Sequence, residues 1–228
     1  MTLGEEFSPL RPGSLFEMQF SCPYLPQKEP FKHLRDEAYL IPNAPFLLQE
    51  DNFAKIHMGW NEEGLYFYME SERPFTDVFY PEFQRGDALQ LFIDTRDNKS
   101  STILTRFCHQ FLFLPKEIEG TQAVETTRFR TDDQHELCNP KELVCESSFQ
   151  KNSYSMNIFI PTQCLHGYDP IECNRIGFTF CVYSTGGLRQ HFSAHSDEFS
   201  YETFPALWSR AILTNENHPV RPASRAKR

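Results

Sequence analysis

The chain has 228 residues, of which 39% are hydrophobic and 23% are charged, and its formal net charge is −9. This composition supports a sizeable core and argues against a disordered chain. The acidic balance argues against a broad surface for nucleic acid or anionic membranes. No segment approaches the roughly 18 apolar residues that a membrane span needs, so we expect no membrane span.

The cysteines and the N-terminal sequence indicate the compartment. The start lacks a basic stretch followed by an apolar run, so it does not resemble a secretory signal. The number of cysteines is odd and no pair has C-x-x-C spacing, which is atypical of a disulfide framework or zinc knuckle. We therefore expect reduced, mostly buried thiols and a cytoplasmic location. The seven residues are Cys22, Cys108, Cys138, Cys145, Cys164, Cys173 and Cys181.

The two ends differ in composition from the body. We predict a lead-in over residues 1–19, one domain over 20–214 and a flexible basic tail over 215–228. The tail contains four cationic side chains and no acid after His218, so a nucleic-acid arm is the alternative. Four charges with two prolines fall short of a basic block, which favours a flexible end.

The predicted elements begin with a proline-rich stretch over residues 20–50, where we expect extended chain and short strands. Apolar residues then alternate over 54–60, which predicts a strand. The turn residues 61–64 and a second strand over 65–70 predict a hairpin. A further strand is predicted over 87–94.

The second half of the chain continues this pattern. We predict a strand over 106–115 that ends at Pro115. Less regular strands are expected over 126–131 and 142–148, and well-alternating ones over 153–161 and 175–184. Each of these segments is short and is followed by polar or turn-forming residues, as in an all-β domain.

Two more strands and one short helical turn complete the prediction. The strands cover residues 188–194 and 207–213, and the helical turn covers 162–165. No long amphipathic helix is evident. About ten short strands in one domain predict an all-β fold, an antiparallel, jelly-roll-like β-sandwich with few short helices.

Four segments in this order resemble the family 9 carbohydrate-binding modules and the broader DOMON-like β-sandwiches. They are AKIHMGWNEEGLYFYME, RGDALQLFIDTRD, NSYSMNIFIP with RIGFTFCVY, and FPALWSRAIL, within residues 54–213. The resemblance implies a noncatalytic sandwich that binds sugar on a concave sheet face or at loop ends. Standard catalytic motifs such as G-x-S-x-G and H-E-x-x-H are also missing, so we expect no enzyme.

The resemblance also implies where a sugar would bind. Gln90 stands where the family's "D-x-x-E" step has an acid, and Phe83 stands where an aromatic precedes that step. Arg106 matches an arginine on the next strand, but Cys108 replaces the expected asparagine. Tyr80 and Phe83 belong to a loop that either contacts ligand or packs onto the sandwich.

Polar residues on the predicted strands form either a sugar-binding groove or a solvated outer face. Gln90, Arg106 and Gln110 would form a groove for sugar hydroxyls if their faces coincide, and Arg106→Ala should then abolish binding. A solvated outer face is the alternative.

The departures from the family pattern favour a second function, an intracellular protein–protein interaction domain that has lost sugar binding. Trp60 and Trp208 are interpreted as packing residues.

Metal sites are considered at two places, and no cofactor is expected. Asp87, Asp94 and Asp97 surround one strand and offer oxygen ligands for a structural Ca²⁺, although turn-forming and Arg-paired carboxylates are favoured. The H-x₃-H-x-D run from His191 would bring two imidazoles together only on a helix, and a strand is predicted there. His109 is interpreted as a core histidine.

Overall fold

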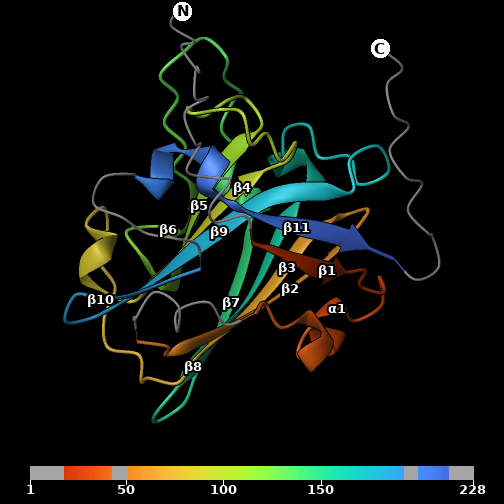
Figure 1. Cartoon of the computed structure of the whole chain (residues 1–228). Coiled ribbons are helices and arrows are strands. Elements are labelled where there is room, and N and C mark those ends of the chain that lie inside the picture. The colour runs from red at the N-terminus through yellow and green to blue at the C-terminus, as the bar shows by residue number, and fades with distance from the viewer. Residues whose placement is uncertain (1–17, 43–50, 193–199, 216–228) are drawn as a thin grey trace, which may run out of the picture.

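The alternating segments form the strands of two packed β-sheets in the computed structural model, which describes residues 18–42, 51–192 and 200–215 (Figure 1). This architecture confirms the predicted β-sandwich, and antiparallel pairing dominates both sheets. Residues 1–17 and 216–228 lie outside the described residues. The predicted lead-in and basic tail therefore stay predictions.

The smaller sheet has four strands in the order β2-β3-β8-β7, and every pairing in it is antiparallel. Its strands are β2 (Ala54–Asn61), β3 (Gly64–Ser71), β7 (Val144–Phe149) and β8 (Tyr154–Pro161). The predicted hairpin of 54–60 and 65–70 is thus confirmed as β2 and β3.

The larger sheet has seven strands, in the order β1-β11-β9-β4-β5-β6 with β10 paired to β9. The β1–β11 pairing is parallel and the others are antiparallel. Its strands are β1 (Gln19–Pro23), β4 (Ala88–Asp94), β5 (Cys108–Ile118), β6 (Thr121–Glu125), β9 (Arg175–Ser184), β10 (Leu188–His191) and β11 (Ser209–Thr214).

Helical structure among the described residues is short, as predicted. The single α-helix is α1 (Pro30–His33), which contacts β3. The remaining turns are 3-10 helices: η2 (Glu37–Tyr39), η3 (Phe83–Arg85), η4 (Pro140–Glu142), η5 (Thr162–Cys164), η6 (Tyr201–Thr203) and η7 (Pro205–Leu207). No described helix is long and apolar enough to span a bilayer.

The main core lies between the two sheets and follows the period-two alternation. Leu89, Leu91 and Ile93 of β4 face it and are completely buried. Across the core, the Phe67 ring of β3 stacks on Phe178 of β9 with a centroid distance of 5.7 Å. Burial of these side chains supplies the main driving force for packing the sheets.

Glycine is required at the end of the β2–β3 hairpin. Gly64 has a φ of 151°, a conformation that side-chain-bearing residues rarely adopt. A Cβ atom at this position would lie 2.2 Å from the backbone oxygen of Ile160 on β8. The predicted turn therefore also fixes how closely β3 and β8 approach.

Two predictions in the middle of the chain are wrong. Strand β5 does not end at Pro115 but continues to Ile118, because the pairing with β6 shifts register in this stretch and tolerates the missing donor. Residues 126–131 are not a strand. The Gln110 N–H donates to the side chain of Thr127 rather than to a backbone carbonyl, which ends the ladder after β6.

Other strand boundaries differ by a few residues. Strand β7 covers Val144–Phe149 rather than 142–148. Strand β11 begins at Ser209 rather than at 207, because the 3-10 turn η7 occupies Pro205–Leu207. Of the return strand predicted over 188–194, β10 forms the first four residues, and residues 193–194 lie outside the described residues.

Candidate functional site

The outer face of the seven-stranded sheet, where the sequence placed a sugar groove, is covered by a second hydrophobic cluster. Outward side chains of β4, β5 and β9 pack there against loop residues. The buried loop residues are Val78, Leu104, Tyr201 and Trp208, and the partly buried ones include Phe75, Tyr80, Phe83 and Phe129. Strand β4 is consequently buried on both faces.

The two predicted glutamines are enclosed by this cluster. Gln90 is 5% exposed, and its Oε1 accepts a hydrogen bond of 2.9 Å from the Tyr183 hydroxyl. Gln110 is 7% exposed, and its Nε2 donates to the backbone oxygen of Glu202. Both side-chain amides are therefore hydrogen-bonded to other groups of the protein and largely shielded from water.

Arg106 does not join the glutamines. It lies in the turn before β5 rather than on the strand, and its exposed guanidinium pairs with Asp133. Gln90 and Gln110 do share one face, since β4 and β5 pair with Phe92 opposite Gln110. The structure thus brings together two of the three predicted groove residues and leaves the third outside the cluster.

The predicted aromatic loop packs onto the sandwich. The Phe83 ring meets Tyr183 edge-on with a centroid distance of 5.5 Å. Tyr80 also packs against the second cluster, and both side chains are half-buried. Ligand contact by Tyr80 and Phe83 stays a prediction, while their packing role is visible.

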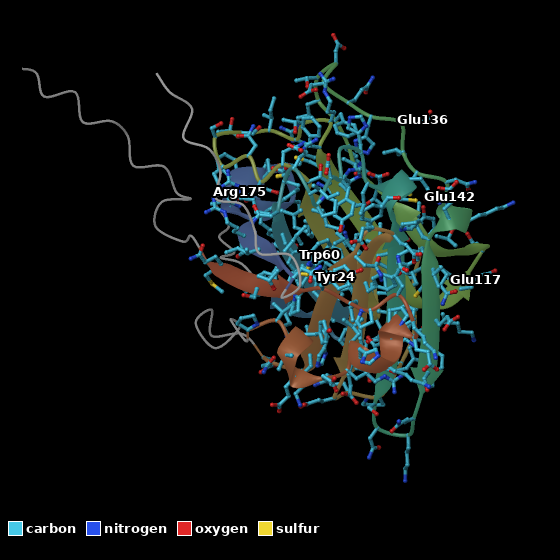
Figure 2. All side chains as sticks on the ribbon, turned by 90° about the vertical axis from the view of Figure 1, so that its right-hand side faces the viewer. Tyr24, Trp60, Glu117, Glu136, Glu142 and Arg175 are labelled. Atoms are coloured by element: carbon cyan, nitrogen blue, oxygen red, sulfur yellow. The ribbon has the colours of Figure 1, made fainter. Side chains whose placement is uncertain are left out.

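The two tryptophans are packing residues, as predicted. Trp208 is 1% exposed, and its Nε1 donates to the Tyr201 backbone oxygen over 2.7 Å. Trp60 is 7% exposed and its Nε1 donates to the backbone oxygen of Thr214. Figure 2 shows Tyr24 beside Trp60, where the rings meet edge-on at 5.3 Å.

The three aspartates considered for calcium lie at opposite ends of β4. Asp87 precedes the strand, and Asp94 ends it, about 23 Å further along an extended chain. Asp87 accepts hydrogen bonds from the Thr76 N–H and the Ser184 hydroxyl. The three carboxylates therefore do not form one oxygen shell.

Asp94 and Asp97 stabilise the turn that follows β4. Asp94 accepts the N–H groups of Arg96 and Asn98, which closes the turn, although burial raises its pKa. The carboxylate of Asp97 is buried and pairs with Lys99 and Arg210. These contacts are those of turn-forming and Arg-paired carboxylates.

The predicted histidine run is only partly described. His191 ends β10, is buried, and meets the Tyr201 ring edge-on at 5.0 Å. His195 and Asp197 lie outside the described residues. The extended backbone at His191 agrees with the prediction of a strand there.

A polar groove is present on the outer face of the four-stranded sheet. It has a volume of about 100 Å³. Strands β3, β8 and β7 form its floor, and the segment after α1 contributes one wall. Its lining residues are Arg35, Tyr68, Glu70, Ser148, Gln150, Ser153, Tyr154 and Ser155.

Strand register explains why these side chains meet. Glu70, Ser155 and Ser148 are opposite one another on β3, β8 and β7, so they form one row across the sheet. The Arg35 guanidinium lies over the Tyr68 ring, 4.9 Å from its centroid. The groove thus combines a cation, a carboxylate, hydroxyls and an aromatic ring within a small area.

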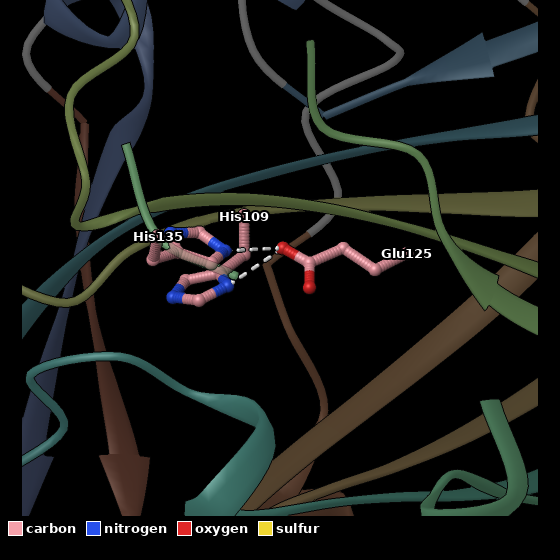
Figure 3. Close-up of side chains that lie close together, drawn as sticks. All are labelled: His109, Glu125 and His135. Carbon is pink, nitrogen blue, oxygen red and sulfur yellow. Dashed lines mark hydrogen bonds and ion pairs between the residues drawn. The ribbon is translucent and has the colours of Figure 1, made fainter. Parts of the chain in front are cut away.

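A second polar cluster lies at the edge of the main core and was not predicted. His109 on β5, Glu125 at the end of β6 and His135 in the following segment point toward one another (Figure 3). Glu125 Oε1 lies 2.9 Å from His109 Nδ1 and 2.8 Å from His135 Nε2. The His109 ring also stacks on Phe111, so its prediction as a core residue is confirmed.

Burial and mutual contact set the pKa values in this cluster. Burial alone would raise the pKa of Glu125, but hydrogen bonds with His109 and His135 outweigh it and lower the pKa to about 2. Burial lowers the pKa of His109, and the contact with Glu125 opposes that change. Glu125 is therefore an ionised, buried carboxylate at neutral pH.

Comparison with known proteins places the fold. No family model matches the chain, and no curated protein matches it. A family 9 carbohydrate-binding module from Caldicellulosiruptor kristjanssonii in complex with cellotriose superimposes with a TM-score of 0.60 and 14% identity, covering 90% of this chain and 100% of that one. The glucose complex of a module from the same family and organism gives a TM-score of 0.57 and 12% identity, with the same coverage.

A third solved structure agrees with these two. A proposed carbohydrate-binding protein from Bacteroides uniformis has a TM-score of 0.58 and 8% identity, covering 86% of this chain and 99% of that one. At such identities the similarity is one of fold, and it extends over nearly the whole chain. The chain therefore has the fold of the family 9 carbohydrate-binding modules.

Proposed function

We propose that the chain is a noncatalytic carbohydrate-binding module. The observation that carries this proposal is the match over 90% of the chain to a module solved with cellotriose. The order of sequence motifs that resembles the same family supports it independently. Binding by a preformed surface needs no covalent chemistry.

The Arg35 groove, defined by the eight lining residues given above, is the proposed contact surface. Its serines and Gln150 offer hydrogen-bond donors and acceptors, and Arg35 and Glu70 add charged ones. At about 100 Å³ the groove is smaller than most small-molecule pockets. It therefore suits one sugar ring or the end of a glycan rather than an enclosed ligand.

The covered face of the seven-stranded sheet favours a second candidate function. Gln90 and Gln110, the polar residues expected to contact sugar, are engaged by Tyr183 and Glu202 instead. This closure supports the alternative of a protein–protein interaction domain that has lost sugar binding. A direct measurement of glycan binding distinguishes the two candidate functions, because only the carbohydrate-binding module is expected to bind.

Calorimetry with glucose and cellotriose tests the proposal. We expect the full chain to bind, and Arg35→Ala to weaken binding about tenfold or more, because a charged hydrogen bond contributes roughly 1.5–3 kcal/mol. Arg85→Ala is the matched control. Arg85 also lies over an aromatic ring, 4.8 Å from the Phe79 centroid, but it does not line the groove.

Two outcomes would contradict parts of this proposal. A folded protein that gives no heat with either sugar, followed by a blank glycan array, would favour the interaction domain. Binding that survives Arg35→Ala but is lost in Arg106→Ala would move the site to the turn before β5, where Arg106 lies.

A further inference from the structure

The cluster of His109, Glu125 and His135 has the composition of a transition-metal site. Two imidazole nitrogens and one carboxylate oxygen lie within 4.8 Å of one another. His₂Glu sets of this kind hold Zn²⁺ in proteins, with a water completing the tetrahedron. The side chains come from β5, β6 and the segment after β6, and Figure 3 shows that they converge on one point.

The spacing of the three atoms is close to what zinc needs. Zinc bonds of about 2.0–2.1 Å at tetrahedral angles place neighbouring ligand atoms about 3.3 Å apart. Glu125 Oε1 lies 2.9 Å from His109 Nδ1 and 2.8 Å from His135 Nε2. Lengthening these two contacts by a few tenths of an ångström would bring them to the spacing of zinc ligands, and all three ligand atoms already lie within 4.8 Å of one another.

Outer contacts already orient the ligands. The His135 Nδ1 lies 2.7 Å from the backbone oxygen of Arg106, which can only accept, so Nδ1 carries a hydrogen and Nε2 is directed inward. The other oxygen of Glu125, Oε2, accepts the Cys138 N–H over 2.9 Å. Metal-ligating histidines and carboxylates are characteristically held by such outer partners.

Three polar groups surround a single oxygen atom of Glu125. Glu125 Oε1 faces His109, His135 and the Thr127 hydroxyl, which donates over 2.8 Å. The two imidazole rings are only 4.2 Å apart, and His109 Nε2 is buried. A cation bound between the two rings and the carboxylate would replace the hydrogen bonds with which both histidines compete for this oxygen.

We infer that His109, Glu125 and His135 bind one Zn²⁺ ion and that this ion fastens the segment after β6 to the sandwich. His135 lies within residues 126–139, which contain no helix or strand. Binding would tie this segment to β5 and β6, and a site that exists only in the folded chain adds its binding energy to folding. His109 and Glu125 belong to the seven-stranded sheet, whereas the Arg35 groove lies on the outer face of the other sheet.

Zinc titration of the EDTA-treated full chain tests this inference. We expect one equivalent of ZnCl₂ to bind by calorimetry and elemental analysis, and the melting temperature to rise. His135→Ala should weaken affinity by more than the roughly 10–100-fold that loss of an outer partner costs. His33→Ala is the control, since it removes an exposed histidine of α1.

Co²⁺ spectroscopy of the unmodified protein keeps the inference testable if a variant fails to fold. Visible d–d bands without a thiolate charge-transfer band are expected for nitrogen and oxygen ligands. Absence of stoichiometric zinc, equal losses in His135→Ala and His33→Ala, or a thiolate band would overturn the site. None of these readouts depends on sugar binding.

Discussion

Replacing Glu125 by Gln removes the carboxylate that both His109 and His135 contact, while the side-chain volume is retained. The substitution acts at the edge of the main core, where Glu125 is 3% exposed. An amide cannot supply the ionic partner that the two rings share. We therefore expect Glu125→Gln to destabilise the chain even when metal is absent.

The pKa of Glu125 sets the magnitude. Its folded-state value is about 2, compared with an ordinary value of 4.5. Each pKa unit corresponds to about 1.4 kcal/mol, so the carboxylate contributes roughly 3 kcal/mol at neutral pH. Because the folded-state pKa is the lower one, this stabilisation is present above about pH 4.5 and is lost as the pH falls toward 2.

Urea unfolding in EDTA, followed by tryptophan fluorescence, measures the effect. We expect Glu125→Gln to lose roughly 3 kcal/mol at pH 7 and less at about pH 3.5. Glu146→Gln, an exposed carboxylate on β7, should stay within about 0.5 kcal/mol of the unmodified chain. A Glu125→Gln variant as stable as that control at pH 7, or a loss of stability that does not shrink in acid, would contradict a stabilising role for the ionised carboxylate.

Two further substitutions probe how the sheets are held. Gly64→Ala should cost about 2 kcal/mol or more in urea unfolding, because of its φ of 151° and the oxygen of Ile160 2.2 Å from the new Cβ; an unchanged midpoint would contradict this. Gln190 joins β10 to the start of β2, since its amide binds the Phe53 and Ala54 N–H groups and the Ala54 oxygen. Gln190→Leu should cost about 3 kcal/mol, and a loss below about 1 kcal/mol would show that these groups find other partners.

The strands were predictable where one periodicity extends over the whole element. In β2 and β8, apolar residues alternate because one face packs on the core, and the alternation is visible in the sequence. Strand β3 is apolar almost throughout, because its outward Tyr66 and Tyr68 are buried in a separate cluster. Pro115 was a misleading signal, because a proline is tolerated where the β5–β6 register shifts. Segment 126–131 has strand-like composition, but Thr127 bonds to the backbone through its side chain.

The candidate sites were harder to predict than the strands. Alternation places Gln90 and Gln110 on one face of the sheet, but it does not reveal that loops carrying Tyr201 and Trp208 cover that face. The Arg35 groove depends on a contact between Arg35 and Tyr68, which are far apart in the sequence. Such contacts arise from tertiary packing and leave no local pattern.

The His109 cluster shows the same limit for a metal site. The β5–β6 turn separates His109 from Glu125, and a segment without helix or strand separates Glu125 from His135. The spacing of the three residues therefore matches no ligand motif. The sequence identified His109 as a core residue, which is correct, but offered no signal for Glu125 or His135 as its partners. Pairing of β5 with β6 is what brings the first two together.

Amide chemical-shift mapping with cellotriose measures carbohydrate binding and locates the binding surface in one experiment. We expect saturable shifts at groove residues such as Tyr68, Ser148 and Ser155, with Gln90 and Gln110 unaffected because they are enclosed. Shifts confined to other surfaces would contradict the proposed groove. A spectrum unchanged by glucose, cellotriose and the hits of a glycan array would contradict carbohydrate binding itself.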